Sequence, residues 1–202
     1  MSSGDVAAVW MHAITYRTDM LREMGYRQTE GVPFTDQDWV FYPMACVRDA
    51  YYLPVTVYRY WVGREGQTVE ENYYIQNFHV IYQLTIQQIE RFQILAQQAT
   101  QGGRHFMTER IYARSMNIYH YYLLRNEKVL KKAIKKLITF DELLKRTLPK
   151  SYKRCGDVYF SRRIPIKYVN AWRAKKSGQP LMWFFLQFVC LPIARIKMRL
   201  GR

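Results

Sequence analysis

Residues 34–43 read Phe-Thr-Asp-Gln-Asp-Trp-Val-Phe-Tyr-Pro, and this stretch decides how the first part of the chain folds. Thr35 suits a helix N-cap, and Asp38 falls three positions later, where a capping-box acid reaches back to the backbone N–H of the cap. Asp36 then takes the first helical position, where unpaired N–H groups and the helix dipole favour an ionised carboxylate. Pro43 is expected to interrupt or kink the helix. A carboxylate held beside a cleft can act as a base, whereas the alternative is that both acids only start a helix.

Two further stretches carry a resemblance to a known family. Residues 11–21 read Met-His-Ala-Ile-Thr-Tyr-Arg-Thr-Asp-Met-Leu, and residues 57–68 read Val-Tyr-Arg-Tyr-Trp-Val-Gly-Arg-Glu-Gly-Gln-Thr. With residues 35–39 they resemble the second half of the GT-A catalytic domain in glycosyltransferase family 2, as found in bacterial capsule and cell-wall sugar transferases. In that family an acidic pair, usually Glu-Asp, supplies the base that deprotonates the acceptor hydroxyl. The resemblance implies that Asp36 is this base and that Thr35 replaces the first acid.

The loop over residues 63–68 contains two glycines, which allow close backbone approach, and an arginine whose planar donor fork suits a diphosphate. The alternative is a plain turn with a solvated arginine. In the family this loop closes over the donor or acceptor phosphates, and the position of His12 lies near the acceptor and leaving-group site. The resemblance therefore implies substrate binding by His12, Asp38, Arg64 and Gln67. Without the resemblance, a single histidine there is a packed or solvent-facing residue.

Local patterns predict short strands and a short helix around these stretches. Ile14-Thr15-Tyr16 is β-prone, and a helix that begins at Thr18 is expected to end near Gly25. Residues 50–61 are rich in aromatic and β-branched types, which predicts one or two strands with Pro54 at an edge.

From Glu71 onward, apolar residues recur at the spacing of helices. One helix is expected to end at Gln101-Gly102-Gly103, a second to cover residues 106–124 and a third to cover residues 127–148, where Pro149 stops it. The aromatic residues of the second helix stand at helical spacing, which favours packing over a base-stacking platform.

These patterns predict an α+β, mostly helical fold. The chain has 202 residues, about half of them apolar, enough for one ordinary domain with a tail. The resemblance implies the C-terminal half of a GT-A domain, with short strands and helices, over residues 1–70. A helical extension over residues 71–150 and a basic tail over residues 151–202 follow.

The positive charge of the chain lies entirely in its second half. Residues 1–100 contain 7 Lys and Arg against 11 Asp and Glu, a net charge of −4, whereas residues 101–202 contain 24 against 5, a net charge of +19. A charge polarised in this way points to a polyanionic partner, either nucleic acid or the anionic face of a membrane. Composition alone does not choose between them.

Cysteine usage and the N-terminus indicate the compartment. Cys46, Cys155 and Cys190 are far apart and show no C-x-x-C spacing, so neither a zinc site nor a disulfide framework is expected, and a reducing cytosol fits. The first residues lack the charged and apolar regions of a signal peptide, so export is not predicted.

Residues 181–194 form an apolar stretch between basic flanks. As a helix this stretch reaches only about 21 Å, short of the roughly 30 Å of a hydrocarbon core. Lysines and arginines stand on both sides: Arg173, Lys175 and Lys176 before it, and Arg195, Lys197, Arg199 and Arg202 after it. We therefore expect an in-plane or shallow anchor on an anionic leaflet, peripheral to the cytoplasmic face of a membrane. The alternative is a buried helix with basic ends.

The resemblance implies a glycosyltransferase that moves a sugar from a nucleotide-sugar to a saccharide acceptor with inversion. Family members hold Mn²⁺ or Mg²⁺ on the diphosphate with an Asp-x-Asp motif in a preceding half-domain, and no such motif stands before Asp36. Asp36-Gln37-Asp38 has the Asp-x-Asp pattern itself, but its position in the chain matches the family's catalytic-base segment and not its metal motif. We therefore expect little or no transfer by this polypeptide alone.

Two other classes of protein remain open. A nucleic-acid-binding module would use the basic half and show steeply salt-dependent binding, although nucleic acid is not the expected partner. A non-catalytic adaptor at a membrane surface would use the tail and tolerate loss of Asp36.

Overall fold

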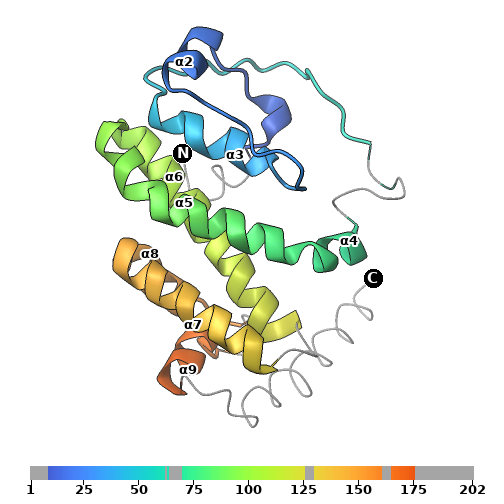
Figure 1. Ribbon diagram of the computed structural model, residues 1–202, viewed down its shortest axis with the longest axis vertical. Coiled ribbons are helices and arrows are strands. Elements are labelled where there is room, and N and C mark those ends of the chain that lie inside the picture. Colours follow the sequence, from blue (N-terminus) through green and yellow to red (C-terminus); the bar gives the residue numbers. More distant parts are fainter. Residues whose placement is uncertain (1–8, 62, 64–69, 126–129, 161–164, 176–202) are drawn as a thin grey trace. The chain divides into compact units, whose positions relative to one another are not determined.

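A computed structural model describes residues 9–61, 63, 70–125, 130–160 and 165–175. The described chain is mostly helical, as the sequence predicts (Figure 1). It divides into two compact units, Met1–Ala113 and Arg114–Arg202, and the boundary falls within helix α6. The first unit therefore contains the acidic stretch at residues 34–43 together with helices α4 (Glu71–Gln76) and α5 (Phe78–Gln98) and the start of α6.

The first unit begins with two short helical segments. The 3₁₀ turn η1 (Met11–Ala13) is followed by extended chain through Ile14-Thr15-Tyr16 and by helix α2 (Thr18–Glu23). Gly25 follows α2 with φ of +62°, a conformation that glycine adopts without a steric penalty. The predicted helix and its end are confirmed, whereas the predicted strand over Ile14–Tyr16 is wrong.

The acidic helix α3 (Asp36–Phe41) is short because of its proline. Pro43 cannot donate a backbone hydrogen bond, and the chain continues after Phe41 as the 3₁₀ turn η2 (Tyr42–Ala45). Val40 of α3 packs with Phe106 in a buried apolar cluster, and Val9, Ile14 and Met44 lie around it. The predicted interruption at Pro43 is confirmed.

The predicted helix from Glu71 is two helices. Helix α4 (Glu71–Gln76) ends at Asn77, whose side-chain amide donates to the carbonyl oxygen of Tyr73 at 2.9 Å, and α5 (Phe78–Gln98) begins there. In Figure 1 the long helix α5 runs beside α3, and the two are in contact. Phe78, Ile81 and Ile89 are buried on the inner side of α5.

Gly102 and Gly103 do not end a helix, contrary to the prediction. Helix α5 already ends at Gln98, and both glycines lie in the first turn of α6 (Gln101–His120). Gly103 is placed there because its Cα approaches the backbone of η2: a Cβ at this position would lie 2.6 Å from the carbonyl oxygen of Met44. Gly103 therefore allows α6 to pack closely against η2 and does not end a helix.

The strands predicted over residues 50–61 are not present, and the described residues contain no β-strand at all. Residues 50–61 run as extended chain beyond η2 (Figure 1), and their apolar side chains are exposed, with Tyr51 at 93% and Trp61 at 76%. A strand requires a partner that accepts its backbone hydrogen bonds. The mostly helical fold is therefore confirmed, but the short strands of a GT-A half are not found in the described residues.

The second unit is built from the end of α6 and three further helices. A π-helical turn, η3 (Tyr121–Arg125), follows α6, and α7 (Leu130–Thr147) is separated from α8 (Pro149–Gly156) by Leu148. Helix α9 (Tyr168–Lys175) packs against α8. Leu137, Phe140 and Leu144 form the buried side of α7, and Pro149 ends α7 as predicted.

A buried polar network joins the elements of this unit. Nε of Arg173 donates to Oδ1 of Asp141 at 2.8 Å, and the hydroxyl of Tyr119 donates to the same oxygen at 2.6 Å. The guanidinium also donates to the hydroxyl of Tyr119 and, at 2.9 Å, to the carbonyl oxygen of Tyr152. Arg173 is thus part of the interior, so its predicted role as a membrane-facing flank of the apolar tail is wrong.

The predicted anchor over residues 181–194 lies outside the described residues. Among the described helices, none is both long and apolar enough to cross a bilayer.

Candidate functional site

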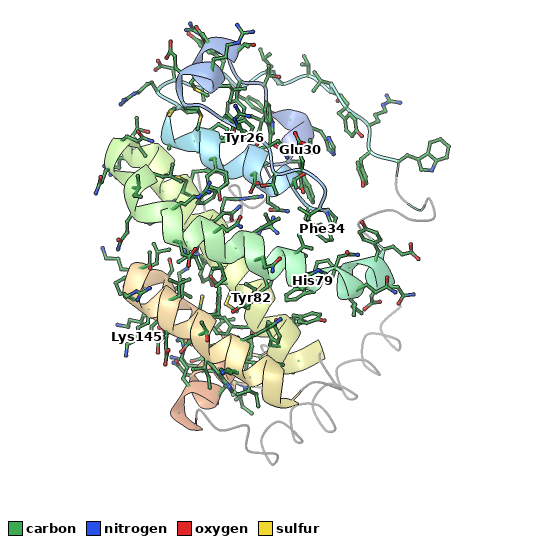
Figure 2. The ribbon with its side chains drawn as sticks, viewed as in Figure 1. Tyr26, Glu30, Phe34, His79, Tyr82 and Lys145 are labelled. Carbon is green, nitrogen blue, oxygen red and sulfur yellow. The ribbon has the colours of Figure 1, made fainter. Side chains whose placement is uncertain are left out.

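Both predicted acids lie on α3, and a loop from the end of α2 runs along this helix. Asp38 is 1% exposed, whereas Asp36 is half-buried. Figure 2 shows Tyr26 and Glu30 on the loop beside α3. The ring of Tyr26 packs edge-on against Trp39 with the centroids 5.7 Å apart. The loop therefore covers part of α3 and contributes to the burial of Asp38.

Asp38 is held by this loop and not by the helix cap. The hydroxyl of Thr29 donates to Oδ2 of Asp38. Oδ1 of Asp38 is buried without a hydrogen-bond partner among the described residues. Thr35 makes no side-chain cap bond, so the predicted capping box is wrong, although Asp36 does take the first helical position.

Burial dominates the electrostatics of Asp38. It raises the pKa of the carboxyl above its ordinary value, while hydrogen bonding by Thr29 and the charge of Arg91 act in the opposite direction. The negative charge of Asp38 adds to burial in raising the pKa of Tyr26 and of Tyr42, the latter to about 12. The guanidinium of Arg91 in α5 lies 5.4 Å from the ring centroid of Tyr42. Asp38 is therefore a buried acid that retains its proton more readily than an exposed aspartate.

Asp36 faces a different environment, which includes Arg110 of α6. The side-chain amide of Gln37 donates to Oδ2 of Asp36 at 3.4 Å, a long bond. Burial lowers the pKa of Arg110, and the negative charge of Asp36 counteracts that shift. Arg110 also donates to the carbonyl oxygen of Val9 at 3.4 Å. This arginine therefore links α6 to the N-terminal segment and balances the charge of Asp36.

Two tyrosines flank the indole of Trp39 beside the acids. Tyr16 packs edge-on against Trp39 with the centroids 5.0 Å apart, and Tyr26 does so from the loop. The hydroxyl of Tyr16 is buried without a hydrogen-bond partner among the described residues. Burial and the neighbouring Tyr26 raise the pKa of Tyr16, while Arg110 lowers it. Aromatic rings and polar hydroxyls thus surround the acidic helix.

His12 lies on η1, which packs against α3. Its imidazole stacks on the ring of Tyr58 with the centroids 4.2 Å apart and the planes inclined by 17°, and Tyr60 lies at 5.6 Å. The His12 ring therefore packs against the extended segment of residues 50–61. Although η1 contacts α3, the observed ring partners of His12 are these two tyrosines.

Arg64 and Gln67, predicted to bind phosphates, lie outside the described residues. The structure does identify three residues that the sequence did not indicate: Thr29 and Arg91 beside Asp38, and Arg110 beside Asp36. Arg91 and Arg110 stand more than 50 residues after the acids, so no local pattern could associate them with α3.

The residues around α3 do not fit a divalent metal. In the part of the chain that the structure describes, no group of three or more His, Cys, Asp or Glu residues could hold such an ion. One oxygen of Asp38 is already engaged by Thr29, and its carboxylate is buried. Asp38 of the Asp36-Gln37-Asp38 sequence is therefore engaged by the loop and enclosed in this structure.

The raised pKa of Asp38 predicts a dependence of stability on pH. The folded state binds this proton more tightly than the unfolded chain does, so the favourable contribution is complete below the ordinary pKa of about 3.9 and is lost as pH rises through the raised value. We expect Asp38→Asn to remove this pH-dependent loss of stability. The free energy of unfolding of the variant should therefore rise relative to that of the native protein as pH rises. Urea unfolding at a series of pH values measures the difference.

Asp19 offers a control of opposite sign. This exposed carboxylate is bonded by Arg17, which lowers its pKa, so Asp19→Asn removes a contribution that is lost as pH falls. If Asp38→Asn followed the pH dependence of the native protein, Asp38 would not be the buried acid described above.

No protein-family model matches this chain, and comparison with curated proteins and with solved structures finds no match either.

Proposed function

We propose that this chain is the acceptor-side part of a glycosyltransferase similar to family 2 that acts in cell-surface polysaccharide synthesis, with Asp36 as the general base. The observation that carries the proposal is the contrast between the two acids of α3. Asp36 is half-buried, with Arg110 to balance its charge, whereas Asp38 is 1% exposed and bonded to the loop. A base must meet its substrate, and of the two acids Asp36 is the more exposed, which supports this choice.

In the proposed reaction, the carboxylate of Asp36 accepts the proton of an acceptor sugar hydroxyl. The acceptor oxygen then forms a bond to the anomeric carbon of the donor, and the nucleoside diphosphate leaves with the electron pair of the broken bond. This direct displacement inverts the anomeric centre. Asp38, expected from the resemblance to contact substrate, instead holds the loop through Thr29 in this proposal, so its role is to position α3.

The exposed rings near α3 suit the acceptor side. His12 stacks on Tyr58 and Tyr60, and neighbouring Trp61 is also exposed. Rings of this kind present a flat apolar surface with polar edges, which suits the mixed surface of a saccharide. Binding of the nucleotide-sugar and of Mn²⁺ or Mg²⁺ is assigned to a separate half-domain, because the described residues around α3 do not fit a metal.

The test is a transfer assay with nucleotide-sugars, Mn²⁺ and saccharide acceptors. We expect little transfer by the chain alone, and transfer when a nucleotide-sugar-binding half that carries Asp-x-Asp is supplied. In that complete enzyme, Asp36→Asn should lower the rate by about 10²–10⁴-fold, the usual contribution of a general base. Circular dichroism should show an unchanged fold.

The matched control is Asp49→Asn, the same chemical change at an exposed position outside α3. It should leave the rate unchanged. Native activity in a folded Asp36→Asn enzyme would refute the assignment of the base.

The second candidate is a non-catalytic protein of a membrane surface, which the net charge of +19 on residues 101–202 favours. In that case Asp36→Asn is silent in cells, whereas deletion of residues 181–202 abolishes function. Both candidates place the protein at the cytoplasmic face of a membrane as a peripheral component.

A further inference from the structure

Positive charge is concentrated on the exposed sides of α7 and α8 in the second unit. We call the following five exposed side chains the basic face: Lys135, Lys145, Arg146, Lys150 and Lys153. The ammonium group of Lys145 lies 5.9 Å from the ring centroid of Tyr152, so it joins the surface of α7 to that of α8. Figure 2 shows Lys145 on the outer side of these helices.

The acids of the same helices offset little of this charge. Asp141 is buried and bonded to Arg173, and Asp157 is paired with Lys167 at 2.8 Å. Glu142 is the remaining acid of α7, and it is exposed. The basic face therefore has a clear excess of positive charge over the acids of these helices.

The apolar side of α7 is not available to a partner. Leu137, Phe140 and Leu144 are buried in the unit, and Ser151 and Cys155 form the buried side of α8. The two helices are thus amphipathic, with the apolar side used for packing and the basic side left exposed. A partner would therefore bind these helices by electrostatic attraction, because their apolar residues are buried and cannot insert into it.

We propose that the basic face docks on an anionic lipid surface. A polybasic patch is one of the signals from which stable membrane association is generally built. The inference extends the membrane location in the proposed function and does not depend on Asp36.

The chemistry of the basic face favours lipid over nucleic acid. Four of its five cations are lysines, which act as flexible point charges, whereas bases are read by the planar fork of arginine and by stacking rings. A lipid surface presents diffuse negative charge that requires no fixed geometry. Each lysine or arginine near such a surface contributes roughly a fivefold gain in partitioning.

The experiment measures co-sedimentation of the full chain with vesicles of phosphatidylcholine alone and of phosphatidylcholine mixed with phosphatidylserine. The test variant replaces four residues of the basic face with glutamine: Lys135, Arg146, Lys150 and Lys153. We expect a several-hundredfold weaker partition into the phosphatidylserine vesicles, because four fivefold contributions are lost. Binding by the native chain should also fall steeply as salt is raised.

The matched control removes the same charge from exposed arginines of the first unit, namely Arg22→Gln, Arg27→Gln, Arg48→Gln and Arg59→Gln. This control should bind almost as the native chain does. A chain without residues 181–202 should keep salt-sensitive binding to the anionic vesicles.

Three results would overturn the inference. The first is an equal loss in the test and control variants, which would mean that net charge alone matters. The second is undiminished binding by the folded test variant, which would mean that the basic face does not carry the binding. The third is binding of the basic face to a duplex oligonucleotide at physiological salt without binding to anionic vesicles. None of these results bears on the role of Asp36, which the transfer assay tests separately.

Discussion

Replacing Arg173 with alanine is expected to lower the free energy of unfolding of the second unit by about 3–5 kcal/mol, the usual cost of removing one partner of a buried ion pair. Arg173 and Asp141 are 8% and 3% exposed at their side chains, and Nε lies 2.8 Å from Oδ1. Without the guanidinium, the carboxylate of Asp141 keeps only the hydroxyl of Tyr119 as a hydrogen-bond donor among the groups of this network. A buried charge would then be left without its counter-ion.

The same arginine joins its own helix to three others, which enlarges the expected effect. From α9 it reaches Asp141 on α7, the carbonyl oxygen of Tyr152 on α8 and the hydroxyl of Tyr119 at the end of α6. Its guanidinium carbon lies 3.5 Å from the ring centroid of Tyr152, a stacking contact that alanine cannot make. Burial raises the pKa of Tyr119, so its hydroxyl remains a donor across the physiological range. The loss should therefore be shared by all these helices.

Urea unfolding followed by circular dichroism measures the change, and hydrogen exchange locates it to α7, α8 and α9. Lys167→Ala is the control, because it breaks the exposed pair with Asp157 in the same unit and should change stability far less. Combining Arg173→Met with Asp141→Leu and Tyr119→Phe should recover much of the loss, because no buried charge then remains unpaired. If Arg173→Ala were no more destabilising than Lys167→Ala, the network would not hold the unit together.

The second large effect is expected from a comparison of two neighbouring glycines in α6. A Cβ at Gly103 would lie 2.6 Å from the carbonyl oxygen of Met44, which belongs to the backbone of η2 and cannot rotate away. Gly103→Ala should therefore destabilise the first unit by about 1–3 kcal/mol, the usual cost of overpacking. At Gly102 the nearest atom to an added Cβ is 4.0 Å away. Gly102→Ala should therefore stabilise the unit by about 0.5–1 kcal/mol through helix propensity.

Opposite signs for one chemical change at adjacent positions would be difficult to attribute to anything except the contact with η2. Thermal unfolding of both variants, measured at one pH and protein concentration, gives the comparison. Stabilisation by Gly103→Ala would show that η2 and the first turn of α6 are further apart than the structure places them.

Part of the fold could be predicted from local sequence because its causes are local. Pro43 ends α3 and Pro149 begins α8 because proline lacks a backbone N–H, and this holds whatever surrounds it. Gly25 follows α2 with positive φ for an equally local reason. The mostly helical character after Glu71 follows from the 3.6-residue period, which each segment carries by itself.

Other predictions were wrong because they concern partners far away in the chain. The aromatic and β-branched residues over 50–61 are suited to a strand, yet a strand forms only where another chain segment accepts its hydrogen bonds. Gly102 and Gly103 were interpreted as a helix end, but Gly103 is explained by the backbone of η2 almost 60 residues earlier. No local pattern links Thr29 to α3, yet its hydroxyl donates to Asp38, which does not bond to the helix cap.

The sequence by itself determined that the chain is mostly helical, that Pro43 and Pro149 interrupt helices and that Asp36 occupies the first position of α3, since these depend on a few adjacent residues. Only the tertiary structure decided which acid is buried and which is more exposed, because burial depends on the loop that folds over Asp38, and the charges near the acids come from Arg91 and Arg110 on distant helices. It likewise decided that Arg173 belongs to the interior while Lys135 and Arg146 remain exposed. The sequence alone does not tell which basic residues are buried, because that depends on which side of each helix packs against the rest of the unit.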